Sequence, residues 1–256
     1  MKICIVPQFT GEKLNYIFKY DFKYCLASFA FLRKVKNENI KKIVKRLKKC
    51  DLFILDSGAF TYMNSGGDLK KINQYLTEYI NFINKYDIKY FIELDLYTVI
   101  GIEKTNLLTK RLEQETGKKS IPVFHALLGI DWFKQKTKEY DYIAIGASGV
   151  TDECKWVKDK NKLKFLVNIA HKNGCKVHGL GYTRTCNINS KEVRFDSVDS
   201  TTWSAGSRFG GVFYIKNNKI LRKDYNKKGY KIKNIKGIDE NNFKVWCMYQ
   251  SIGDKL

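Results

Sequence analysis

Residues 176–203 read KVHGLGYTRTCNINSKEVRFDSVDSTTW and contain two short apolar segments that each run into small and polar residues. We expect strands at 176–180 and 195–199, because functional sites in parallel α/β folds gather at the carboxyl ends of the strands. Alternation along the second strand puts Val193, Phe195, Ser197 and Asp199 on one face, and Arg194, Asp196 and Val198 on the other. Asp199 is therefore the first catalytic candidate, and Arg194 is positioned to pair with Asp196.

Strands and helices alternate along the chain before this stretch. Apolar segments predict strands at 2–6, 52–56, 90–96, 121–125 and 142–146, while 24–32 fits either a strand or a buried helical turn. Helical spacing of apolar residues predicts helices at 39–49, 69–83, 103–116, 131–139 and 161–173. Asp68 is the expected N-cap of the second helix, and Gly174 ends the last. Eight strand candidates interleaved with helices favour an α/β fold of the (β/α)8 TIM-like barrel type, with an open doubly wound sheet as the alternative.

The pattern changes after Ser207. Residues 210–225 predict a β-hairpin that turns at Asn217 and Asn218. A basic linker and a short helix follow, and this helix carries Phe243, Trp246 and Cys247 on one face. We therefore divide the chain into a barrel catalytic domain, residues 1–215, and a C-terminal extension, residues 216–256, packed on the barrel.

The charge of the chain is strongly positive. Its 47 Lys and Arg residues outnumber 26 Asp and Glu residues, and bases concentrate at 33–49 and 216–236, with nine bases against one acid in each segment. Such surfaces suit a polyanionic partner, because basic side chains neutralise phosphates. The residues expected to contact nucleic acid are Arg184, Arg194, Arg208, Lys41, Lys45 and Lys48.

The seven cysteines show no close spacing of the kind that holds zinc or forms a disulfide framework, so we expect free thiols and no metal site. No apolar run approaches the ~20 residues that cross a bilayer. The opening residues, MKICIVPQFT, have too short an apolar run for a signal peptide and fit a first strand. These features predict a cytoplasmic protein with no membrane partner.

Three predicted strands end in an aspartate: Asp56 in LDSGAF, Asp95 in ELDLYT and Asp199 in SVDSTTW. Any one of them alone could be a helix N-cap or a turn residue. In a barrel, however, the three strand ends converge on one pocket. Other strand ends supply His125, Gly146, Gly179 and Gly181, and glycines allow a planar ligand to approach the backbone. Convergent carboxylates without a metal motif suit glycosyl transfer, in which one attacks the anomeric carbon and another carries a proton.

These segments resemble a known family. LDSGAF at 55–60 is similar to the base-binding motif of the queuine and archaeosine tRNA-guanine transglycosylases, which are (β/α)8 barrels, and ELDLYT, IAIGA, HGLG and VDSTTW follow in the family's order. The tRNA enzymes also carry closely spaced zinc-binding cysteines and a histidine after the nucleophile, and this chain has none. It looks more like the compact phage-type relatives that insert 7-deazaguanine derivatives into DNA.

The resemblance implies that Asp199 attacks C1′ of a target deoxyguanosine and that Asp56 transfers protons at the purine. It implies DNA and a 7-deazaguanine as partners, no cofactor, and the host cytoplasm as the location if a phage encodes the chain. The implied substrate-binding residues are Ser57, Gly58, Asp95, His125, Gly146, His178, Gly179 and Gly181.

Three alternatives stay open at this point: a tRNA-guanine transglycosylase acting on tRNA, a non-catalytic barrel that binds nucleic acid, and an unrelated glycosidase-like barrel. An alignment through Phe195 and Asp196, as in the bacterial enzymes, would make Asp196 the nucleophile instead of Asp199.

Overall fold

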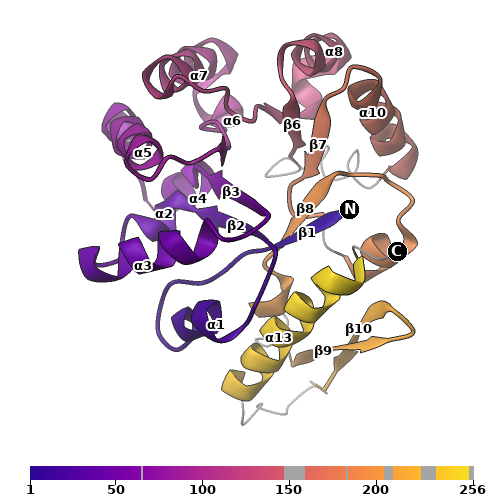
Figure 1. Cartoon of the computed structure of the whole chain (residues 1–256). Helices are drawn as coiled ribbons and strands as arrows, with labels where there is room; N and C mark the ends of the chain where they lie inside the picture. Colours follow the sequence, from indigo (N-terminus) through magenta and orange to yellow (C-terminus); the bar gives the residue numbers. More distant parts are fainter. Residues whose placement is uncertain (65, 147–158, 183, 205–209, 226–234, 254–256) are drawn as a thin grey trace.

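The structure is a computed structural model that describes residues 1–64, 66–146, 159–182, 184–204, 210–225 and 235–253. Its main sheet has eight strands in the order β4-β3-β2-β1-β8-β7-β6-β5, and every neighbouring pair is parallel. The two edge strands meet through one parallel bridge between Ile92 and Ile121. The sheet therefore curls into a (β/α)8 TIM-like barrel with helices around it, as predicted (Figure 1).

Six of the predicted strands occur within two residues of their expected bounds, and the strands in segments 24–32 and 90–96 are shorter than those segments. The barrel strands are β1 (Lys2–Ile5), β2 (Tyr24–Ser28), β3 (Leu52–Asp56), β4 (Tyr90–Phe91), β5 (Val123–Phe124), β6 (Tyr142–Ile145), β7 (Lys176–Gly179) and β8 (Ser197–Ser200). The ambiguous segment 24–32 contains both candidates, because β2 runs directly into the short helix α2 (Phe29–Leu32).

The prediction of a strand over 90–96 is wrong beyond Ile92, and hydrogen bonding gives the reason. At the β4–β5 seam, the N–H of Ile121 donates to the carbonyl of Phe91, and the carbonyl of Ile121 accepts from the N–H of Glu93. The N–H of Val123 donates instead to the carboxylate of Glu93, at 2.7 Å. The carboxylate of Glu93 thus accepts in place of a backbone carbonyl, and a single bridge joins the β4 and β5 sides of the barrel.

The helices lie outside the strands. Those whose bounds the described residues give before residue 210 are α1 (Lys13–Lys19), α2, α3 (Asn37–Leu47), α4 (Ala59–Asn64), α5 (Ile72–Tyr86), α6 (Tyr97–Ile100), α7 (Ile102–Thr116), α8 (Gly129–Glu139), α10 (Lys160–Lys172) and α11 (Thr185–Ser190), with 3-10 turns η1 (Leu69–Lys71) and η2 (Ala126–Leu128). Asp68 caps η1, which leads into α5, by accepting from the N–H of Lys70 at 2.9 Å. Among the described residues, none of the helices combines the length and apolarity needed to cross a bilayer.

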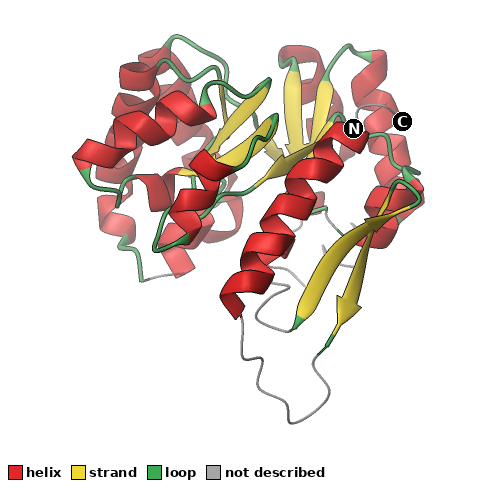
Figure 2. Cartoon of the chain, turned by 60° about the horizontal axis from the view of Figure 1, so that its bottom comes forward, coloured by secondary structure: helices red, strands yellow, loops and turns green. Residues whose placement is uncertain are grey.

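The C-terminal segment starts with the predicted hairpin, β9 (Gly211–Lys216) and β10 (Lys219–Asp224), and Asn217 and Asn218 both have the positive φ of its turn. The last helix, α13 (Ile235–Gly253), has 19 residues, so the expectation of a short helix is wrong. It lies beside the hairpin (Figure 2) and packs on β1 and α1, the place of an eighth barrel helix.

Buried polar side chains fix α13 to the barrel. The side chain of Gln250 donates to the carbonyls of Ile3 and Tyr24, at 2.7 and 2.6 Å, and accepts from the N–H of Lys23. Asn242 in the same way bonds Phe213 and Gly211 of β9. Residues on both sides of the predicted boundary at 215 therefore belong to one packed unit, and β9 itself crosses that boundary.

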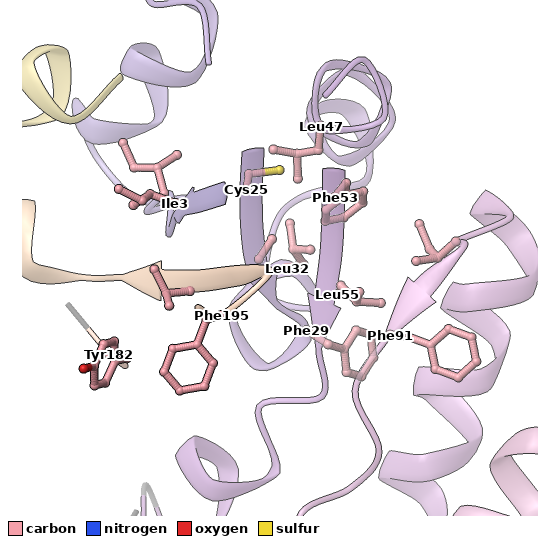
Figure 3. Packing of buried hydrophobic residues seen from close by; sticks show 14 of the residues in the cluster. Ile3, Cys25, Phe29, Leu32, Leu47, Phe53, Leu55, Phe91, Tyr182 and Phe195 are labelled. Atoms are coloured by element: carbon pink, nitrogen blue, oxygen red, sulfur yellow. The ribbon is translucent and has the colours of Figure 1, made fainter. Parts of the chain in front are cut away.

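Apolar side chains form two layers. The inner layer fills the barrel, and Cys4, Leu26, Ile54, Val123 and Ala144 belong to it. The outer layer packs strands against helices, and Figure 3 shows part of it. Along each strand, side chains alternate between the two layers. The candidate site therefore consists of the inward-pointing residues at the carboxyl ends of the strands, beyond the inner apolar layer.

Candidate functional site

Asp56 and Asp199 lie at the carboxyl ends of β3 and β8, and Asp95 follows β4 by four residues. The three carboxyl groups are close enough to interact. The pKa of Asp56 is raised to about 6, chiefly by burial and also by the charges of Asp199 and Asp95, while the hydrogen bond from the N–H of Gly58 acts to lower it. The structure therefore brings together the three strand-end aspartates that the sequence singles out.

Asp199 has one anchored oxygen. Its Oδ1 accepts from the backbone N–H of Gly181 at 2.7 Å and lies 3.3 Å from Nε2 of His178. Its Oδ2 has no hydrogen-bond partner among the described residues, and the Asp199 side chain is 12% exposed. Gly181 has φ +65°, the left-handed conformation that turns its N–H onto the carboxylate. The arrangement holds one oxygen and leaves the other for a ligand.

Asp95 is paired with His125. Nε2 of the imidazole lies 2.7 Å from Oδ1 and 2.9 Å from Oδ2 of the carboxylate, and His125 is buried. Gly146 makes room for this ring, because a Cβ there would lie 3.0 Å from Cε1 of His125 and 2.9 Å from Val123. Gly146 and His125 therefore act together to place Asp95.

Ser57 and Gly58 form the turn after Asp56. Ser57 is 1% exposed, and its carbonyl accepts from the hydroxyl of Tyr75 at 2.5 Å. Gly58 has φ +66°, and a Cβ on it would lie 2.4 Å from Oγ of Ser28 and 2.6 Å from Cβ of Ala30. This turn is therefore packed from behind, and only glycine fits at position 58.

Replacing Gly58 with alanine should lower the free energy of unfolding by about 3 kcal/mol, from the left-handed backbone and from the overlap with Ser28. Gly117→Ala is the matched control, because Gly117 has nearly the same φ, +65°, with nothing within 4 Å of an added Cβ. It should cost about 1 kcal/mol. Urea unfolding of both variants measures the difference, and equal losses would show that position 58 tolerates a side chain.

Gly179, an expected site residue, lies against the outer layer. A Cβ on Gly179 would meet Phe195 and Tyr182 at 3.1 Å, on the outer side of the barrel wall. Val193 and Phe195 precede β8 and pack in the outer layer, so the prediction that they share a face with Asp199 is wrong. Figure 3 shows the rings of Phe195 and Tyr182 side by side. The alternation holds only within β8, where Ser197 and Asp199 point inward and Val198 outward.

Asp196 also differs from expectation. Its Oδ2 accepts from the backbone N–H of Val177 at 2.8 Å and lies 2.9 Å from Nε2 of His171, so the predicted pair with Arg194 does not form. It precedes β8, at the opposite end of that strand from the three carboxylates. Asp196 therefore ties β7 to β8 and α10, and it lies away from the candidate site.

Glu93 is a buried acid that the sequence reasoning missed. Its Oε1 accepts from Val123 N–H at 2.7 Å and from Tyr97 hydroxyl at 3.1 Å, and its Oε2 accepts from Thr109 at 2.7 Å. Burial raises the pKa of Glu93 to about 7, with a further contribution from Asp95. The signal was present in ELDLYT as a second acid two residues before Asp95.

Glu93 should make stability fall as pH rises. The folded carboxyl holds its proton up to about pH 7 while the unfolded one loses it near 4.5, so unfolding becomes easier between these values, by roughly 3 kcal/mol. Glu93→Gln should keep the three contacts, with its amide donating to Thr109, and remove this slope. Urea unfolding from pH 4.5 to 8 measures it, with the exposed Glu103→Gln as control. A slope unchanged in Glu93→Gln would assign it to other groups.

The basic candidates are spread over the surface. Lys41 and Lys45 are exposed on α3, whereas Lys48 donates to the carbonyls of Tyr86 and Asp87, at 2.8 and 3.2 Å. Arg184 is exposed at the start of α11. Arg194 is exposed before β8, at the end opposite to Asp199, and Arg208 lies outside the described residues. Of these arginines, Arg194 therefore lies away from the three carboxylates.

The cysteines of the described segments are free thiols, and most of them are buried; Cys154 lies outside these segments. Within the same segments, no group of three or more His, Cys, Asp or Glu side chains is placed to hold a metal ion.

The fold and site together describe a (β/α)8 barrel with an acidic cluster at the carboxyl ends of its strands. No family model matches the chain, and no curated protein matches it.

Proposed function

We propose that this chain is a transglycosylase that exchanges guanine in DNA for a 7-deazaguanine derivative. The observation that carries the proposal is the grouping of Asp199, Asp56 and Asp95 at the carboxyl ends of barrel strands, with different surroundings for each carboxyl group. Paired carboxyl groups with different proton affinities suit a nucleophile and a proton carrier in glycosyl transfer. The motif resemblance supplies the base and the polymer.

In the first half of the reaction, a carboxylate oxygen of Asp199 attacks C1′ of the target deoxyguanosine. The bond from C1′ to N9 breaks, its electron pair goes to the purine, and the purine takes a proton from Asp56. The product is neutral guanine and a glycosyl ester on Asp199. Oδ2 is the oxygen free to form this ester, because Oδ1 is held by Gly181.

In the second half, N9 of the 7-deazaguanine gives its proton to the Asp56 carboxylate and attacks C1′. The ester bond breaks and Asp199 returns as a carboxylate. Two displacements at one carbon retain its configuration. The ester conserves the glycosidic bond energy, so the exchange needs neither ATP nor a redox cofactor. A pKa of about 6 suits Asp56 to both proton transfers near neutral pH.

DNA is the proposed polymer because of the charge and the motif resemblance. The chain carries a formal net charge of +21, and basic surface holds a phosphate backbone at moderate salt. The target base must leave its stack to reach a carboxylate at the end of a barrel, at a cost of a few kcal/mol.

The direct test is exchange of labelled guanine, and of 7-deazaguanines, into duplex DNA, single-stranded DNA and tRNA in parallel. Incorporation into DNA supports the proposal. Incorporation into tRNA alone would keep the chemistry and overturn the polymer, and no incorporation into any of the three would overturn the proposed activity.

Charge reversal on α3 tests the binding surface. Lys41→Glu with Lys45→Glu should weaken DNA binding and reduce the slope of log Kd against log salt by about 2, one unit for each lost phosphate contact. Lys110→Glu with Lys138→Glu is the control, because both lysines are exposed on other helices and the net charge changes equally. Equal effects of the two pairs would assign binding to overall charge and not to α3.

A further inference from the structure

Four inward side chains form a continuous hydrogen-bonded row across three neighbouring strands. Tyr142 of β6 has its hydroxyl 2.5 Å from Oγ of Ser197 in β8. Ser197 Oγ also contacts Nδ1 of His178 in β7, and Nε2 of His178 lies 3.3 Å from Oδ1 of Asp199. His178 and Ser197 have no exposed surface, and they are partners in the β7–β8 register.

The chemistry of the end groups sets the direction of these hydrogen bonds. An ionised Asp199 only accepts, so Nε2 of His178 carries the proton. In a neutral imidazole Nδ1 is then an acceptor, which takes the hydroxyl proton of Ser197. Ser197 Oγ accepts in turn from Tyr142, whose phenol stays protonated because burial raises its pKa. Each donor in the row has one acceptor, so the row selects a single tautomer of His178.

This arrangement does not fit the substrate contact expected for His178. Its ring is fully buried, and both nitrogens are occupied by Ser197 and Asp199. The ring therefore has no free edge to read a base.

We propose that His178 is a positioning residue for Asp199, held by Ser197 and Tyr142 in the tautomer that carries its proton on Nε2. With Gly181 N–H it fixes Oδ1 and directs Oδ2 toward the ligand. The catalytic consequence rests on the proposed base exchange, whereas the tautomer and the contact with Asp199 do not.

The tautomer can be measured without any activity. The chain has three histidines, so ¹⁵N spectra of the imidazoles are assignable with His178→Gln. We expect His178 to show a protonated Nε2 and an unprotonated Nδ1 at neutral pH. Ser197→Ala should mix the two tautomers, and Tyr142→Phe should shift the Nδ1 resonance. A proton on Nδ1 in the wild type, either as the other tautomer or as imidazolium, would overturn the proposal.

The catalytic consequence is measured as the rate of formation of the covalent protein–DNA adduct. His178→Leu should slow it by about 10²-fold, the usual effect of a misplaced reacting group, with unchanged Kd for DNA. His178→Gln should recover most of the rate, because its amide places a donor where Nε2 stood. Circular dichroism checks that each variant folds.

The outcomes separate the two proposals. A His178→Leu variant that is folded and forms adduct at the wild-type rate would overturn the positioning role. If the wild type itself forms no adduct, the base-exchange proposal fails, and the ¹⁵N measurement alone decides whether His178 donates to Asp199.

Discussion

Asp199→Asn should abolish base exchange and the denaturant-resistant adduct with DNA, a loss on the order of 10⁴-fold or more, as expected for a missing nucleophile. Asparagine keeps the size of the side chain and an Oδ1 that accepts from Gly181 N–H. It removes only the anionic oxygen, so Kd for DNA should stay near that of the wild type. A gel that separates adduct from free protein after denaturation measures the first effect, and a binding titration measures the second.

Asp196→Asn is the control for Asp199→Asn. Asp196 bonds Val177 N–H and His171 at the other end of β8, so its replacement should cost about 1 kcal/mol of stability and leave the adduct intact. If Asp199→Asn still forms adduct and Asp196→Asn does not, the nucleophile is Asp196 and the assignment is wrong.

Asp56→Asn should slow both halves of the reaction by about 10²- to 10⁴-fold, the usual contribution of a proton carrier. The pKa of Asp56 is about 6, and the two halves need opposite forms of it. In the wild type, adduct formation should therefore fall as pH rises through about 6, because the acid form is lost. Attack by the 7-deazaguanine on preformed adduct should rise over the same range, because the base form appears.

Single-turnover rates between pH 5 and 8 measure each half separately. Asp56→Asn should remove both pH dependences, while Asp51→Asn, at the exposed other end of β3, should change neither. Asp199→Asn should lower the pKa of Asp56, because the Asp199 charge is one cause of its elevation. Persistence of both pH dependences in Asp56→Asn would assign the proton transfers to another group.

Local pattern in the sequence was enough to predict most elements. Apolar stripes at helical spacing predicted α3 and α5, and the Asn217–Asn218 pair predicted the turn between β9 and β10. These patterns involve only a few neighbouring residues, so they can be recognised without knowledge of the fold. The strand-end positions of Asp56 and Asp199 could be predicted for the same reason, since each lies within or at the end of a short apolar strand.

Alternation failed where a strand stopped. Continued past Ile92, it would put Leu94 inside the barrel, but Leu94 packs in the outer layer and Asp95 contacts His125. The register is lost because Glu93 takes up the N–H of Val123 from the neighbouring strand. A partner thirty residues away decides that geometry, and no local pattern contains it.

The sequence by itself determined the order of strands and helices and the three candidate carboxylates, because apolar periodicity and turn residues act locally. Only the tertiary structure decided which groups surround each carboxylate. Closure of the barrel brings His178 and Gly181 to Asp199, His125 to Asp95, and α13 onto β1. These contacts depend on the register between strands, which long-range backbone hydrogen bonds set only when the whole sheet has formed.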